Sequence, residues 1–378
     1  MYKRILKPIF FKFDPEFVHD FMMWFGEFLG KWTILKWKIG LFYDYKGKDI
    51  SRVVDGIKYR TPFLLSAGFD YNARLMNILP SIGLGGEEIG SITARYCAGN
   101  PTPRLTRLPK SKSILVNKGL RNDGIETIIN RIKKYKKNQK RYYLLRARKF
   151  FSKNFLGSRL DSLESPFEDN ISSDFVIGTS IARTNDEKSA SIEEGIKDYC
   201  YSFRRLNEEN IGDYYTLNIS CPNAYEGETF TNPDLLNRLL VAIKKIPCSK
   251  PIYVKMPINI PWNQFNSLLD IIDKHGLNGV IIGNLNKDYD NLDFREEAPK
   301  EYKGGTSGKP TNHLSTKLIR KTRELYGKRF TIIGCGGVMS VENAQEKFDA
   351  GADLIQLITG LIYHGPGLVK KLCKNVTI

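Results

Sequence analysis

The chain has 378 residues, of which 41% are hydrophobic, and a formal net charge of +17 at pH 7. This apolar content is enough for a folded core and excludes a chain that is disordered throughout. No apolar run approaches 18 residues, so the sequence predicts no membrane-spanning helix. The basic excess alone is compatible with binding to nucleic acid, with an anionic membrane surface, or with a solvated face.

The six cysteines show neither C-x-x-C spacing nor pairing with histidines. This pattern predicts reduced thiols in a reducing compartment and no metal site. The N-terminus is basic, but Asp14, Glu16 and Asp20 interrupt the stretch that would have to be apolar in a signal peptide. We therefore expect no signal peptide and an intracellular protein.

Residues 1–50 differ from the rest and predict two short aromatic helices. The segment Pro15–Gly30 places aromatic and aliphatic residues at i, i+4 spacing, and Asp14 before it is a plausible N-cap. The segment 31–42 mixes two tryptophans with three lysines. Such helices can pack on a domain or lie in a lipid interface, and the pattern is compatible with both.

From residue 60 onward, short apolar runs alternate with helical periodicity. The predicted strands are 63–66, 86–90, 175–178, 215–218, 252–255, 279–282, 331–333 and 354–357. The helical patterns are 192–206, 235–245, 265–275, 315–326 and 341–350. Eight such units predict an α/β fold, a TIM (β/α)8 barrel over residues 51–378. An open doubly wound sheet is the alternative, which the lack of a G-x-G-x-x-G motif after the first strand disfavours.

Residues 133–172 are predicted to be an insertion within the barrel. Between Arg131 and Lys153 the sequence has eleven lysines and arginines and no acidic residue, and a segment rich in serine and acidic residues follows. One interpretation is a solvated helical excursion, and another is a surface for an anionic membrane or another polyanion. No recognition motif accompanies the run, so we expect no specific nucleic-acid partner.

Small and polar residues follow the predicted strands, where a barrel builds its functional site. The sequence Gly334-Cys335-Gly336-Gly337 follows the seventh strand, and Thr359-Gly360 follows the eighth. Backbone amides that can approach a ligand closely at these two ends predict a phosphate-bearing ligand. Lys255 ends the apolar fifth strand, where it either turns outward or meets an anionic ring or substrate in the barrel mouth.

Amides and a thiol occupy other strand ends. Asparagine both donates and accepts hydrogen bonds, which suits a planar polar heterocycle or a carboxylate. The candidates are Asn117, Asn218, Asn223 and Asn284. Cys221 is either a small buried filler or a proton-transfer group, because the thiol pKa of about 8.5 is close to neutrality.

Five motifs resemble those of the FMN-dependent dihydroorotate dehydrogenases. They are NISCPN (218–223), VKMP (254–257), GGTSGKP (304–310), IIGCGGV (332–338) and AGADLIQLITGLIYHGP (350–366). The opening MYKRILKPIFFKFDPEFVHDF and the segment PTPRLTRL (101–108) look like those of the class 2 branch, which is membrane-associated and uses a quinone. The resemblance covers nearly the whole chain except residues 133–172.

The resemblance implies a flavoprotein of pyrimidine (UMP) biosynthesis that oxidises dihydroorotate to orotate and passes electrons to a membrane quinone. It implies FMN contacts from Ala67, Gly68, Thr93, Ser180, Asn218, Lys255, Gly308, Gly336, Gly337, Thr359 and Gly360. It implies substrate contacts from Tyr71, Asn117, Asn218, Asn223 and Asn284, with Cys221 as the catalytic base. His19 and Arg107 would line a quinone tunnel, and the protein would lie peripherally on the cytoplasmic face of an anionic membrane.

Four positions depart from the family pattern. The quinone branch has serine at the position of Cys221, whereas the soluble class 1 enzymes have cysteine there. The other departures are Tyr71 for lysine, Ser180 for asparagine and Leu285 for serine or threonine. Loss of the lysine removes a cation that would pair with the substrate carboxylate. The alternatives are therefore an FMN enzyme acting on another dihydropyrimidine or an enone-like compound, and a non-catalytic barrel that binds a membrane or polyanion.

Overall fold

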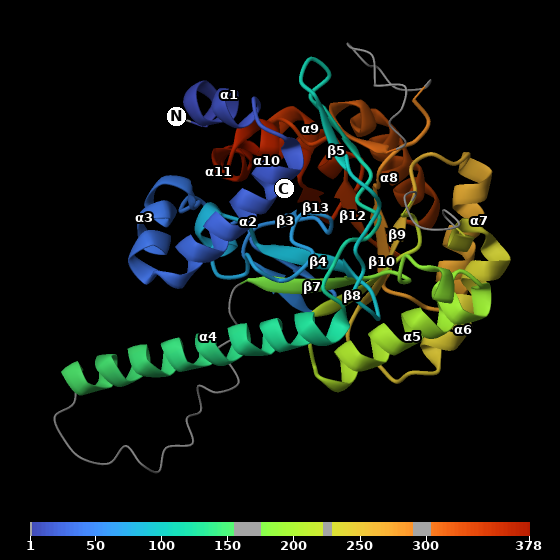
Figure 1. Ribbon diagram of the computed structural model, residues 1–378, viewed down its shortest axis with the longest axis horizontal. Helices are drawn as coiled ribbons and strands as arrows, with labels where there is room; N and C mark the ends of the chain where they lie inside the picture. The colour runs from blue at the N-terminus through green and yellow to red at the C-terminus, as the bar shows by residue number, and fades with distance from the viewer. Residues whose placement is uncertain (1, 155–174, 222–228, 290–303) are drawn as a thin grey trace.

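The central feature of the computed structural model, which describes residues 2–154, 175–221, 229–289 and 304–378, is a closed barrel of eight parallel strands (Figure 1). In order around the barrel they are β10 (Gly279–Ile282), β12 (Thr331–Cys335), β13 (Leu354–Leu357), β3 (Phe63–Leu65), β4 (Gly86–Ile92), β7 (Val176–Ile181), β8 (Tyr214–Asn218) and β9 (Ile252–Met256). Each predicted strand overlaps one of these. The prediction of a TIM barrel is confirmed, and the open-sheet alternative is wrong.

Helices cover the outside of the barrel (Figure 1). They are α4 (Ile125–Asn154), α5 (Ile192–Glu208), α6 (Pro233–Lys244), α7 (Trp262–Lys274), α8 (Asn312–Tyr326), α9 (Val341–Asp349), α10 (Thr359–His364) and α11 (Gly367–Asn375). Side-chain caps fix several of their starts: Ser191 accepts from the amide of Glu194 before α5, and Asn232 accepts from two amides at the start of α6. The five predicted helices correspond to α5 through α9.

Aromatic side chains close the end of the barrel where the strands begin. The hairpin of β1 (Arg52–Val54) and β2 (Ile57–Tyr59) packs against this end. Tyr59, Tyr214 and Tyr253 are fully buried there, and the rings of Tyr214 and Tyr253 meet edge to face at 5.2 Å. The interior is therefore filled at one end, which leaves the opposite end, where the strands terminate, for a polar site.

The N-terminal helices α1 (Lys7–Phe10), α2 (Pro15–Lys31) and α3 (Thr33–Tyr43) pack beside the first crossover of the barrel. That crossover contains only a short helical turn, Leu79–Ile82. Gly26 and Gly30 let α2 approach it closely, because a Cβ at either position would lie within 2.8 Å of Leu75 or Asn77. The two predicted aromatic helices and the Asp14 cap are confirmed. Of the helices in the described ranges, none has both the length and the apolarity to cross a bilayer.

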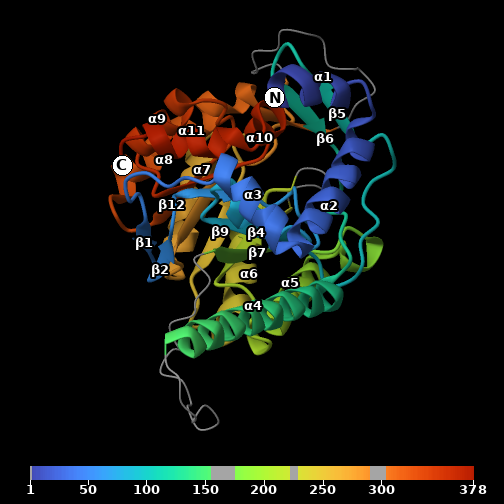
Figure 2. The same ribbon diagram turned by 90° about the vertical axis from the view of Figure 1, so that its left-hand side faces the viewer.

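A three-stranded antiparallel sheet lies over the open end of the barrel. It consists of β5 (Leu105–Leu108), β6 (Ser113–Val116) and β11 (Gly305–Gly308), with β6 in the middle. Figure 2 shows it beside α1 and α2. The sequence patterns did not indicate this sheet, because its third strand comes from a distant part of the chain.

Helix α4 carries the start of the predicted insertion. Ile128, Ile129 and Ile132 are buried against the barrel, and Figure 1 shows the helix continuing past the barrel wall. The helix begins at Ile125, before the predicted start of the insertion, and residues 155–174 lie outside the described residues. The limits of the insertion stay a prediction.

Glu87 on β4 is a buried carboxyl group in apolar surroundings. It pairs in the barrel with Leu65 and Ile177, and neither of its carboxylate oxygens has a hydrogen-bond partner. Burial, together with the nearby Asp70, raises the pKa of Glu87 well above its usual value of 4.5. The folded protein therefore holds a proton at this position that the unfolded chain releases at a lower pH.

We predict that Glu87→Gln raises the melting temperature more at pH 8 than at pH 5. A folded-state pKa above the unfolded value means that stability is fully present below the unfolded pKa and is lost as pH rises through the folded pKa. Glutamine cannot ionise, so it removes this loss, and the shift should be on the order of a few degrees. Thermal denaturation at both pH values measures it, with the exposed Glu187→Gln as control. Equal shifts at both pH values would contradict the account.

Candidate active site

Polar side chains fill the barrel interior above the tyrosine plug, with Glu88 at their centre. Glu88 Oε2 accepts hydrogen bonds from Thr216 Oγ1 and Gln356 Nε2, both at 2.9 Å. Lys255 Nζ lies 3.8 Å from Glu88 Oε1 and donates to Ser66 Oγ at 3.1 Å. Lys255 is only 4% exposed, so the interpretation of an outward-turned lysine is wrong. A buried anion holds this cation in the interior.

Two of the predicted asparagines and Ser180 meet beside this group. Asn218 Nδ2 donates to Ser91 Oγ at 2.7 Å, and that oxygen lies 2.9 Å from Ser180 Oγ. Asn284 Nδ2 lies 3.3 Å from Asn218 Oδ1 and donates to Ser220 Oγ at 2.7 Å. Because each amide is held by neighbouring polar groups, its orientation is fixed.

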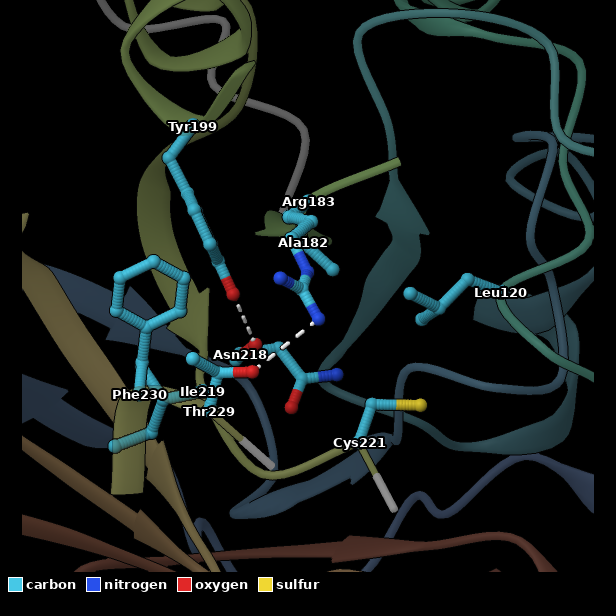
Figure 3. Close-up of a pocket in the computed structure, with 9 residues that line it drawn as sticks. All are labelled: Leu120, Ala182, Arg183, Tyr199, Asn218, Ile219, Cys221, Thr229 and Phe230. Carbon is cyan, nitrogen blue, oxygen red and sulfur yellow. Dashed lines mark hydrogen bonds between the residues drawn. The ribbon is translucent and has the colours of Figure 1, made fainter. Parts of the chain in front are cut away.

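Cys221 and Asn218 line a small pocket of about 20 Å³ (Figure 3). Tyr199 donates from its hydroxyl to the Asn218 carbonyl at 2.7 Å, and Arg183 Nη2 donates to Thr229 Oγ1 at 3.3 Å. In Figure 3 the Cys221 thiol and the Leu120 side chain lie on the side of the pocket opposite Tyr199. The thiol thus opens onto the same space as the asparagine amide.

Glycines and hydroxyls form a cradle where β11, β12 and β13 end. Gly336 and Gly337 have φ of 98° and 75°, and a Cβ on Gly337 would lie 2.5 Å from Asn312 Cβ. A Cβ on Gly308 would lie 2.5 Å from the Lys112 carbonyl. The glycine cradle consists of Gly308, Gly336, Gly337, Thr359 and Gly360, which lie on three segments of the open end. Backbone amides and a hydroxyl gathered in such a cradle suit a phosphate group.

Ala67, Gly68 and Thr93 lie in the loops that follow β3 and β4. The Gly68 amide donates to the Gly90 carbonyl at 2.7 Å. Thr93 is fully buried, and its hydroxyl donates to the Arg95 carbonyl at 2.6 Å and accepts from Asn122 Nδ2 at 2.7 Å. The Thr93 hydroxyl therefore fixes the loop.

Tyr71, a predicted substrate contact in the loop after β3, lies under the N-terminal helices. Its ring lies 5.4 Å from that of His19, and the ammonium group of Lys118 lies 5.6 Å from its centroid. Lys118 pairs with Glu16 on α2 at 2.8 Å. A cation is thus still present beside position 71, although it comes from a different element.

His19 and Arg107 contact different segments: His19 contacts the loop after β3, and Arg107 contacts the segment that precedes α2. His19 Nε2 lies 3.0 Å from the carbonyl oxygen of Phe69 in the loop after β3. Arg107 Nη1 donates to the Phe13 carbonyl at 2.8 Å, and its guanidinium group lies 4.7 Å from the Phe11 ring centroid. Arg107 also lines a cavity of about 380 Å³ between the start of α2 and β5.

The other predicted substrate contacts are placed less centrally. Asn117 Oδ1 accepts from Asn100 Nδ2 at 2.8 Å, at the end of β6. The Leu285 amide donates to Asn284 Oδ1 at 2.9 Å. Asn223 lies outside the described residues.

Sequence reasoning missed the residues that support the site. Glu88, Ser66 and Gln356 hold the interior together, and Leu120 lines the pocket with a φ of 61°, which is unusual for leucine. Glu88 and Gln356 did carry a signal, since a charged or amide side chain within an otherwise buried strand needs a polar partner. That Glu88 contacts Gln356 and Lys255 could be established only from the order of the strands around the barrel.

Comparison with known proteins gives consistent matches over the whole chain. The family model described as dihydroorotate dehydrogenase matches residues 50–377. The curated dihydroorotate dehydrogenase (quinone) of Christiangramia forsetii is 32% identical over 100% of this chain and 98% of its own, and that of Polynucleobacter necessarius is 31% identical over 98% and 97%. The crystal structure of DHODH from Eimeria tenella in complex with ferulenol has a TM-score of 0.76 and 23% identity, covering 96% of this chain and 90% of that one.

We predict that Lys255→Met lowers the free energy of unfolding by about 3 kcal/mol, because it leaves the Glu88 carboxylate buried without its cation. The double variant Lys255→Met/Glu88→Gln should recover a large part of this loss, since no buried charge remains. Urea denaturation of the two single variants and the double variant gives the coupling energy. Strictly additive effects would show that the two charges do not interact.

Proposed function

The chain belongs to the dihydroorotate dehydrogenase family, and we propose that it oxidises dihydroorotate to orotate in pyrimidine biosynthesis, using FMN as its flavin and a membrane quinone as electron acceptor. The observation that carries this proposal is the shared location of three features at the one open end of the barrel. They are the glycine cradle, the buried Lys255 ammonium group, and the asparagine amides beside Cys221. The family match does not favour a non-catalytic barrel.

The residues present fit an FMN group. Glycine is needed at positions 308 and 337, because a Cβ there would clash with the Lys112 carbonyl or with Asn312, and the close turns that glycine allows can present backbone amides to a phosphate. Ala67 and Gly68 offer a small-residue floor for the ring. When bound, FMN would accept the hydride that leaves C6 of dihydroorotate and pass both electrons on to the quinone.

Lys255 would stabilise negative charge at the N1/O2 edge of the flavin ring. Its ammonium group is held by Ser66 and by Glu88, so it needs no reorganisation when charge develops beside it. The Glu88 carboxylate also keeps the lysine in the interior, and Gln356 and Thr216 in turn hold that carboxylate in place.

Cys221 would act as the base that removes the C5 proton of the substrate. The C5–H bond breaks, and the proton passes to the thiolate sulfur. A thiol needs only modest tuning from its usual pKa of about 8.5 to act near neutral pH. Asn117, Asn218 and Asn284 would hold the carboxylate and amide groups of the substrate, with Asn223 as a further expected contact.

A membrane surface is the proposed docking partner of the N-terminal helices. Most of the exposed large apolar side chains of the described residues fall within the first 43 positions. They are Ile5, Ile9, Phe13, Phe17, Phe21, Trp24, Phe25, Phe28, Trp32, Ile34, Trp37, Leu41 and Phe42. The lysines between them would face anionic headgroups, each contributing on the order of 1 kcal/mol. The cavity beside Arg107 lies under this face and would admit the quinone, with His19 on the flavin side.

We predict that the purified chain forms orotate from dihydroorotate only when a quinone is supplied, and that Cys221→Ala slows flavin reduction by about 10²–10⁴-fold. The flavin absorbance itself should be unchanged, because the thiol holds no part of the cofactor. Stopped-flow absorbance measures the reduction rate, with Cys248→Ala as a matched thiol control. Reduction at the wild-type rate by Cys221→Ala would show that another group takes the proton.

We predict that the full chain co-sediments with vesicles containing anionic lipid and that Trp24→Ser/Trp37→Ser weakens this association. Both indoles are more than half exposed, so their loss should affect lipid contact more than packing. Binding should fall as salt is raised, because lysine–headgroup attraction is screened. Sedimentation that is indifferent to both lipid charge and salt would contradict membrane docking through this face.

A further inference from the structure

Lys347 on α9 is a fully buried lysine that the proposed reaction does not use. Its side chain is 0% exposed, and its Nζ donates to Ser315 Oγ at 2.5 Å and to Thr316 Oγ1 at 3.1 Å, both near the start of α8. These partners are neutral hydroxyls. A buried ammonium group whose hydrogen bonds go to uncharged acceptors is strongly disfavoured unless an anion lies nearby.

The position of Lys347 relates it to the glycine cradle. A Cβ on Gly334 would lie 3.3 Å from Lys347 Cδ, so the lysine stem passes directly behind β12. Ser315 Oγ lies 3.5 Å from the Gly336 carbonyl oxygen, and a Cβ on Gly336 would lie 3.4 Å from the same hydroxyl. The Ser315 hydroxyl therefore links the ammonium group to the Gly336 edge of the cradle.

The hydroxyl of Ser315 is suited to pass on the effect of this charge. Its oxygen accepts from Lys347, and its own hydrogen is directed at backbone carbonyl oxygens, those of Asn312 at 3.2 Å and Gly336 at 3.5 Å. A hydroxyl that accepts from an ammonium group becomes a stronger donor through polarisation. Two other lysines lie close to Gly308: Lys309, which follows it in sequence, and Lys112, whose carbonyl packs against it; both are exposed, so solvent screens their charge far more.

We propose that Lys347 is a positioning residue for the flavin phosphate: its ammonium group polarises the Ser315 hydroxyl, whose hydrogen bond to the Gly336 carbonyl makes the amide of Gly337 in the same peptide group a stronger donor to a phosphate in the glycine cradle. This inference rests on the proposed function, since it requires a flavin that carries a phosphate. In this proposal Lys347, which lies outside the cradle, supplies the positive charge that favours a phosphorylated flavin over an unphosphorylated one.

The same arrangement gives phosphate binding a pH dependence. Burial lowers the pKa of Lys347 to about 7, and the groups that act against this shift are Cys335 on β12 and Glu346 on α9, whereas the facing groups of α8 are hydroxyls. A bound phosphate favours the charged lysine and raises that pKa. Preference for FMN should therefore be greatest near pH 7 and weaken as pH rises and the free protein loses this proton.

The test compares FMN with riboflavin, which lacks only the phosphate. The full chain is loaded with each flavin, and the dissociation constants are measured between pH 6.5 and 9 from the flavin fluorescence released on dilution. We expect Lys347→Met to weaken FMN binding about tenfold near pH 7 and to change riboflavin binding little. The preference for FMN in this variant should no longer vary with pH. Lys317→Met, which removes an exposed charge from α8, should behave as wild type.

Ser315→Ala is the second variant, because it removes the intervening hydroxyl while leaving Lys347 its bond to Thr316. It should also lose preference for FMN over riboflavin. An unchanged ratio of FMN to riboflavin affinity in Lys347→Met or in Ser315→Ala would overturn this inference and leave the proposed function standing. Absence of binding of both flavins to the wild-type chain would overturn both.

Discussion

The contact between Lys255 and Glu88 is the interaction on which the rest of the site depends. Both side chains are buried inside the barrel, where a single charge would be strongly disfavoured and a pair with further hydrogen bonds is tolerated. Thr216 and Gln356 satisfy one oxygen of Glu88, and Ser66 accepts from Lys255. Because these residues come from strands on several sides of the barrel, the network also fixes where the interior changes from apolar to polar.

This change divides the barrel into two functional ends. Below it, the tyrosine plug and the β1–β2 hairpin close the interior with aromatic packing. Above it, Asn218, Asn284 and the glycine cradle lie at the end where the strands terminate, where we propose that a ligand binds. Helices α1 and α2 lie with strands β5 and β6 beside the barrel, as Figure 2 shows. We propose that a ring with a phosphate at one side occupies this opening, with the phosphate in the cradle and the ring beside Lys255.

The sequence predicted the barrel well because parallel strands are buried on both faces and appear as short apolar runs. It also indicated Lys255 and the glycine-rich strand ends. It did not identify Glu88 as the partner of Lys255, because β4 and β9 lie far apart in the chain and are not neighbours in the barrel. The sheet of β5, β6 and β11 was not predicted for a similar reason: it pairs residues that are far apart in the sequence, such as Thr306 and Leu115. Tyr71 shows the same limit. Its departure from the family's lysine could be seen in the sequence, but the position of Lys118 beside the Tyr71 ring could not.

The most direct test of the account is an anaerobic titration of the purified full chain with dihydroorotate, followed by addition of a quinone. The account predicts a bound flavin whose visible absorbance disappears with about one equivalent of substrate and returns when the quinone is added. A chain that binds no flavin, or a bound flavin whose absorbance dihydroorotate leaves unchanged, would contradict the account.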